Sequence, residues 1–148
     1  MLLILGAAGA AACLIGSPAG ARILATCGVT HGQAYYLGQP SGWQSDAISS
    51  GRFVFTSDGS KNPNVLFKDV RGAVTNAARS GARISFSLYP DAAREFAIVV
   101  IYPDDRITET YTIVTEARGK KRKLLWTTSK IHGLGFVAKV GAYTADCD

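Results

Sequence analysis

Apolar and polar residues alternate along much of this chain, and this two-residue period limits the fold more than any other feature. In residues 81–89 the two kinds of side chain alternate, as in a strand with one buried face. Residues 107–115 repeat the pattern with many β-branched side chains. Residues 96–102 are continuously apolar, which predicts a central strand covered on both faces. Shorter candidate strands span residues 52–56, 64–70, 123–129 and 136–144.

Little helix is expected in the rest of the chain. Residues 71–80 contain several alanines and predict one short helix, and residues 91–95 fit a single turn. Neither segment is long enough to cover a parallel sheet, so consecutive strands should pair antiparallel. The sequence therefore predicts a mainly β fold, a small antiparallel β-barrel or β-sandwich of about seven to eight strands, with little helix apart from an N-terminal signal segment.

The N-terminal segment has the composition of a secretory signal. Residues 2–16 carry no charge, and the helix-breaking pair Ser17-Pro18 follows them. An uncleaved membrane anchor formed by residues 2–16 is the alternative, although this run is short for a bilayer span of about 20 residues. We therefore expect the chain to be exported, either into the periplasm or out of the cell.

The small residues after this segment predict where a signal peptidase cuts. Ala19 and Ala21 supply the small side chains that the enzyme accepts, which predicts cleavage before Arg22; cleavage after Ala25 is the alternative. Residues 1–21 would then be the signal peptide. The remainder, residues 22–148, forms a single exported β domain.

The composition excludes disorder and a disulfide-dense knot. The 148 residues are 47% hydrophobic and 18% charged, too apolar for an unfolded chain, and three cysteines are too few for a knot. Cys13 lies in the predicted signal peptide, which leaves Cys27 and Cys147. Because an exported chain meets an oxidising compartment, these two are predicted to form a disulfide, with two free thiols as the alternative.

One short segment holds the whole net charge of +5. Five of the six residues at 118–123 are basic, and the other 11 basic residues balance the 11 acidic ones. The segment lies between two predicted strands, at a hairpin tip. It is either a solvated turn that keeps other strands from pairing, or a contact for a polyanion, an anionic lipid surface or an acidic protein; nucleic acid is not expected for an exported chain. The basic residues are Arg118, Lys120, Lys121, Arg122 and Lys123.

Aromatic residues gather near the start of the predicted domain. Tyr35, Tyr36 and Trp43 lie among turn-forming residues. They either plug one end of the core or form a ligand-facing aromatic patch, since tyrosine and tryptophan combine apolar area with a polar group. Trp126 lies on a predicted strand and is expected in the core.

No catalytic, metal-binding or cofactor motif stands out. The exported part has no Walker loop, HExxH, CxxC or GxSxG motif. His31 and His132 are the only histidines, and a hydrolase would need one of them beside a nucleophile and a carboxylate. Two histidines with scattered aspartates show no metal-ligand spacing. We therefore predict no catalytic residue, no metal and no cofactor.

These observations favour an exported, non-enzymatic β domain that binds an envelope partner or an anionic surface. Two alternatives remain. One is a hydrolase that uses His31 or His132, and the other is a β-barrel that carries a small apolar ligand.

Processing gives the first prediction. The intact mass of the exported protein should correspond to a chain that begins at Arg22 or at Thr26. Recovery of the full-length chain in the membrane fraction would contradict it.

Overall fold

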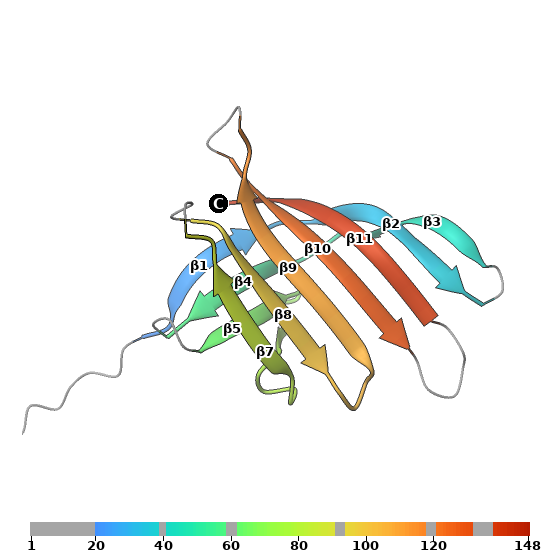
Figure 1. Ribbon diagram of the computed structural model, residues 1–148, viewed down its shortest axis with the longest axis horizontal. Helices are drawn as coiled ribbons and strands as arrows, with labels where there is room; N and C mark the ends of the chain where they lie inside the picture. The colour runs from blue at the N-terminus through green and yellow to red at the C-terminus, as the bar shows by residue number, and fades with distance from the viewer. Residues whose placement is uncertain (1–19, 39–40, 59–61, 91–93, 118–120, 132–137) are drawn as a thin grey trace, which may run out of the picture.

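Eleven antiparallel strands form one strongly curved sheet in the computed structural model (Figure 1). The structure describes residues 20–38, 41–58, 62–90, 94–117, 121–131 and 138–148, and these residues contain no helix. In particular, no helix in these ranges has the length and hydropathy needed to cross a membrane. The strands are β1 (Arg22–Cys27), β2 (Thr30–Leu37), β3 (Gly42–Ile48), β4 (Arg52–Ser57), β5 (Pro63–Lys68), β6 (Val74–Asn76), β7 (Arg83–Leu88), β8 (Phe96–Tyr102), β9 (Ile107–Thr115), β10 (Arg122–Ile131) and β11 (Ala138–Cys147).

The sheet curls into a half-barrel. Its strand order is β6-β5-β4-β1-β11-β10-β9-β8-β7, and β7 returns into contact with β5. The hairpin of β2 and β3 leaves this path and extends beside the lower part of β11, where it widens one end of the half-barrel (Figure 1). The result is a curved inner face with two open ends.

Strand β11 joins the two halves of the sheet. It pairs with β10 along its full length, while on its other side residues 138–144 pair with β2. Its ladder with β1 consists of one residue pair, Cys27 opposite Cys147, and these two cysteines form the predicted disulfide. Two backbone hydrogen bonds flank the pair, from Gly28 to Asp146 (3.0 Å) and from Asp148 to Thr26 (2.9 Å).

The inner face holds the core because every second side chain of each strand points to it. Phe55, Ile98, Ile113 and Leu124 have no exposed surface. Burying four such side chains contributes on the order of 6–12 kcal/mol before chain entropy is subtracted. The middle of the half-barrel is therefore filled, and open space remains only toward its ends.

The observed fold confirms the predicted mainly β, antiparallel architecture, but with a larger number of strands. More strands are present than the seven to eight expected, since β1, β2, β3 and β6 were not predicted. β3 has no buried residue, so it carries no apolar alternation. The N-terminal segment 1–19, predicted to be a signal helix, lies outside the described residues.

The prediction of a helix in residues 71–80 is wrong. Val74–Asn76 form strand β6 instead, because this segment adds to the edge of β5 and Ala77 N donates to Val65 O (3.0 Å). The Asn76 side chain then accepts the backbone N–H of Arg79 (3.0 Å), which holds a turn where a helix would continue. Of the turn expected at residues 91–95, residues 91–93 lie outside the described chain.

Strand β8 is covered on one face only, contrary to the sequence prediction. Phe96, Ile98 and Val100 are buried, whereas Ile101 on the other face is 41% exposed. The reason is that the half-barrel is a single sheet whose outer face meets solvent.

Loss of the disulfide should destabilise the fold. It closes a loop with a sequence separation of 120, so the chain-entropy model predicts that Cys27→Ala lowers the free energy of unfolding by roughly 4–5 kcal/mol. Denaturant unfolding measures the change, and reduced wild-type protein is the control that leaves no cavity at the buried Cys27. Equal stability of the oxidised and reduced proteins would contradict the prediction.

Candidate ligand-binding site

A row of aromatic rings crosses the inner face in register. Tyr111, Trp126 and Tyr143 are direct neighbours on β9, β10 and β11. The Trp126 ring stacks on Tyr143 (centroids 4.4 Å apart) and on Tyr111 (5.9 Å), and Phe53 of β4 packs against it from the opposite wall (5.3 Å). This row marks the boundary between the filled core and the wider end of the half-barrel.

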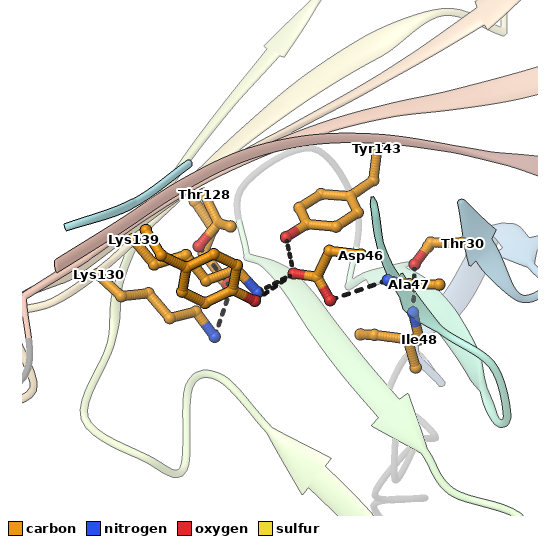
Figure 2. Close-up of polar contacts among 10 residues, drawn as sticks. Thr30, Asp46, Ala47, Ile48, Thr128, Lys130, Lys139 and Tyr143 are labelled. Carbon is orange, nitrogen blue, oxygen red and sulfur yellow. Dashed lines mark hydrogen bonds and ion pairs between the residues drawn. The ribbon is translucent and has the colours of Figure 1, made fainter. Parts of the chain in front are cut away.

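The same row continues across β2 to a carboxylate on β3. Gly32 lies opposite both Tyr143 and Asp46. A Cβ atom at Gly32 would lie 2.7 Å from the Tyr143 ring, so only glycine lets this ring cross β2. The Tyr143 hydroxyl can therefore donate to Asp46 Oδ2 over 2.6 Å, as Figure 2 shows.

Asp46 is the centre of a polar cluster. Besides Tyr143, Tyr36 donates its hydroxyl to Oδ2 (3.0 Å), Ala47 N donates to Oδ1 (2.9 Å), and Lys139 forms an ion pair with it (Figure 2). The ammonium of Lys139 also lies over the Tyr36 and Tyr143 rings, 5.3 and 5.5 Å from their centroids. All of these side chains except Ala47 belong to the inner face at the wide end.

The cluster keeps its charges over a broad pH range. Burial alone would raise the pKa of Asp46, but the hydrogen bonds from Lys139, Tyr143 and Tyr36 outweigh it and lower the pKa to about 2. Burial would likewise lower the pKa of Lys139, yet its hydrogen bond to Asp46 leads the contacts that raise it. Burial and the carboxylate of Asp46 raise the pKa of Tyr143 to about 12.

A second carboxylate, Glu109 on β9, is buried on the same face. Only 7% of its surface is exposed. Tyr111 donates its hydroxyl to Oε2 (2.6 Å), Thr128 donates to Oε1 over a long 3.5 Å, and the Lys130 ammonium lies 3.9 Å from Oε1. Burial first, and then the charge of Glu109, raise the pKa of Tyr111 well above 10 and that of Tyr102 to about 12.

An open cavity of about 300 Å³ lies against Glu109 at this end. Its walls are mostly apolar and aromatic, with three charged side chains. Trp126 also lines it, and within the described chain its buried indole N–H has no hydrogen-bond acceptor. Such an unpaired donor costs about 1–3 kcal/mol. The lining residues are Ile48, Phe53, Val65, Phe67, Thr75, Ala77, Ser80, Tyr102, Asp105, Ile107, Glu109, Tyr111, Trp126 and Lys130.

The structure divides the predicted aromatic patch between the two faces of the sheet. Tyr35 and Trp43 are opposite each other on β2 and β3, with ring centroids 5.6 Å apart, and Trp43 is 65% exposed. Tyr36 points to the inner face, where it donates to Asp46. Adjacent residues of a strand point to opposite faces, so the three rings form no single patch.

The predicted basic segment is similarly divided. Arg118 and Lys120 lie outside the described residues, and Lys121 is exposed. Lys123 is on β10, where its ammonium forms ion pairs with Asp146 and Glu116. Arg122, also on β10, is partly buried, and its guanidinium donates a hydrogen bond to Leu24 O (2.9 Å). These two side chains belong to the strand rather than to a free hairpin tip.

Neither histidine is placed in a catalytic arrangement by the described residues. His31 is exposed on β2 and borders a pocket with Thr144 and Asp146, and it makes no side-chain hydrogen bond within the described chain. His132 lies outside the described residues. No group of three or more histidine, cysteine, aspartate or glutamate side chains suited to a metal occurs in the parts that the structure covers.

The sequence analysis missed the residues that make this site. Glu109 interrupts an apolar face at the position between Ile107 and Tyr111, and a carboxylate there was a readable signal of a buried charge. Lys130 lies on the same face of β10, opposite Ile107 and one inward position beyond Thr128, the residue that pairs with Glu109. Asp46 gave no such signal. Because apolar and polar residues do not alternate along β3, its sequence does not show which face of the sheet Asp46 lies on.

Comparison with known proteins gives no family. No family model matches the chain, and no curated protein matches it. Among solved structures, a protein of unknown function from Bacteroides ovatus is 10% identical, with a TM-score of 0.43; the match covers 81% of this chain and 41% of that one.

Acid should weaken the Asp46 cluster. Because the pKa of Asp46 is about 2 instead of 3.8, its stabilisation is complete above about pH 4 and is lost as the pH falls through about 2. We expect Asp46→Asn to lower the free energy of unfolding at pH 7 by about 1 kcal/mol, after allowance for partial exposure, and to reduce the pH dependence below pH 4. Urea unfolding across this pH range measures both effects.

The matched control is Asp104→Asn, which changes an exposed carboxylate in the turn between β8 and β9. It should leave the stability and its pH profile unchanged. An Asp46→Asn profile that follows the wild type down to pH 2 would refute the role given to the cluster.

Proposed function

We propose that this protein is an exported binding protein that holds a small amphipathic molecule at the wide end of the half-barrel. One observation carries the proposal: Glu109, a buried carboxylate, and Trp126, whose buried indole N–H has no acceptor within the described chain, line the same open aromatic cavity. An apolar cavity with a few converging polar groups is the usual form of a small-molecule site. Its volume of about 300 Å³ suits a small ligand.

The chemistry of the lining favours a ligand with an amino group. Asp105 and Glu109 supply two negative charges, and Lys130 supplies one positive charge. An ammonium group would gain from this balance and from the faces of the surrounding rings, which attract cations. A purely apolar ligand would leave the Trp126 N–H and the carboxylates without new partners, so it fits less well.

Export is part of the proposal. The Cys27–Cys147 disulfide supports it, since such bonds persist in oxidising compartments. Of the two predicted cleavage positions, the one before Arg22 would leave β1 whole, whereas cleavage after Ala25 would remove Arg22 to Ala25 from the strand that pairs with β4. Binding of an anionic surface through the basic segment 118–123 stays a prediction.

The test uses Trp126 as its own reporter. Trp43→Phe removes the other tryptophan, which is exposed on the outer face. Into this variant we would titrate three probes with one aromatic body and different heads: phenethylamine, 2-phenylethanol and 3-phenylpropanoate. We expect the amine to change the Trp126 fluorescence with a Kd of about 1 mM, as its small size allows. The carboxylate should bind at least tenfold more weakly.

Two further substitutions assign the effect to the cavity. Glu109→Gln should abolish the preference for the amine, and Lys130→Gln should strengthen amine binding because it removes the competing cation. Glu116→Gln, an exposed glutamate of the β9–β10 connection, is the matched control and should change nothing. Absence of binding by all three probes, or an unchanged preference in Glu109→Gln, would refute the proposed function.

A further inference from the structure

A second cavity lies at the opposite end of the half-barrel. It has a volume of about 580 Å³ and is bordered by β1, the end of β7, and the starts of β8 and β10. The filled core, with Phe55 and Ile113 at its centre, separates it from the cavity beside Glu109. The described lining residues are Arg22, Ile23, Leu24, Ala25, Thr26, Ser57, Phe86, Leu88, Arg94, Phe96, Arg122 and Asp148.

Three arginines line this cavity, from β1, from the connection between β7 and β8, and from β10. Arg122 on β10 is half-buried and donates from Nη1 to Leu24 O (2.9 Å), which fixes its guanidinium against β1. Burial first, and then the nearby positive charge of Arg94, lower the pKa of Arg122. Arg22 at the start of β1 contributes the third guanidinium.

The positive charge of these three arginines is only partly balanced by acidic residues of the described lining. Among the described lining residues, Asp148 alone is acidic, and its charge raises the pKa of Arg122 against the two larger effects. Arg94 and Arg122 therefore line one cavity in which positive charge is in excess. An anion bound there would reduce the repulsion between the two guanidinium groups.

Apart from Thr26 and Ser57, the rest of the cavity lining is apolar. Ala25 and Phe96 form a buried floor, while Ile23 and Leu88 at the rim are 62% and 59% exposed. Exposed aliphatic side chains beside a charged pocket suit a ligand that has both an anionic head and an apolar chain.

We propose that this cavity binds an oxyanion, a phosphate or a carboxylate, that is carried on an apolar chain. The guanidinium groups of Arg94 and Arg122 hold the head, because their planar donor forks match both oxyanions. Arg22 adds charge at the rim, and the chain lies along Ile23 and Leu88. This site is separate from the cavity beside Glu109, and Arg122 is the only residue of the basic segment 118–123 that it uses.

Calorimetric titration with three probes tests the head and the chain separately. The probes are hexyl phosphate, inorganic phosphate and hexanol, at an ionic strength of about 0.05 M to limit screening. We expect hexyl phosphate to bind at least tenfold more tightly than inorganic phosphate, and hexanol to give no measurable binding. Inorganic phosphate as tight as hexyl phosphate would show a free-anion site and overturn the apolar part of the proposal. Hexanol as tight as hexyl phosphate would overturn the ionic part.

The substitutions identify the site. Arg94→Gln should weaken hexyl phosphate binding at least tenfold, and it leaves the Arg122 contact with Leu24 in place. Arg83→Gln, an exposed arginine at the other end of β7, is the matched control and should bind as the wild type does. If Arg94→Gln binds hexyl phosphate as tightly as Arg83→Gln, the assignment to this cavity is wrong. Amine binding at the wide end should be the same in both variants.

Discussion

The single residue pair between β1 and β11 holds this half-barrel together. One part of the sheet contains β1 and β4 to β6, and the other contains β2, β3 and β7 to β11. The ladder that joins them, between β1 and β11, is the pair of Cys27 opposite Cys147. A ladder of one pair is weak, because a strand gains its stability from repeated hydrogen bonds and neighbouring side chains. The disulfide supplies the constraint that the ladder lacks, and Phe53 and Phe55 then pack against Tyr111 and Trp126 across the interior.

This junction also explains why both ends of the half-barrel are open. Near the disulfide, β11 exchanges β1 for β2, so the β2–β3 hairpin leaves the curve and widens one end. Asp46 is partly buried there and Glu109 almost wholly, and each accepts hydrogen bonds from neighbouring side chains, which a buried carboxylate requires. At the other end β1 and β7 do not pair, and the arginine-lined cavity lies between them.

Much of the fold could be predicted from the sequence, but little of either site could. β7 and β9 alternate strongly in sequence because one of their faces is buried, so their residues predict the strands directly, and the continuous apolar run of β8 also identifies a strand although it does not show which face is covered. β3 has no buried residue, and β6 forms because it pairs with the edge strand β5. Neither strand can therefore be predicted from a pattern in its own residues. The Asp46 cluster depends on a three-strand register with Gly32 in its middle, and no spacing in the sequence reveals a register of that kind.

Hydrogen exchange of the backbone amides tests the role of this junction most directly. The oxidised wild type would be compared with Cys27→Ala/Cys147→Ala under native conditions. Because β8 to β11 keep their long ladders, we expect their amides to stay protected, while the amides of β1, β4 and β5 exchange much faster in the variant. Equal protection in the two proteins, or an equal loss across all strands, would contradict the claim that the disulfide joins two halves of the sheet.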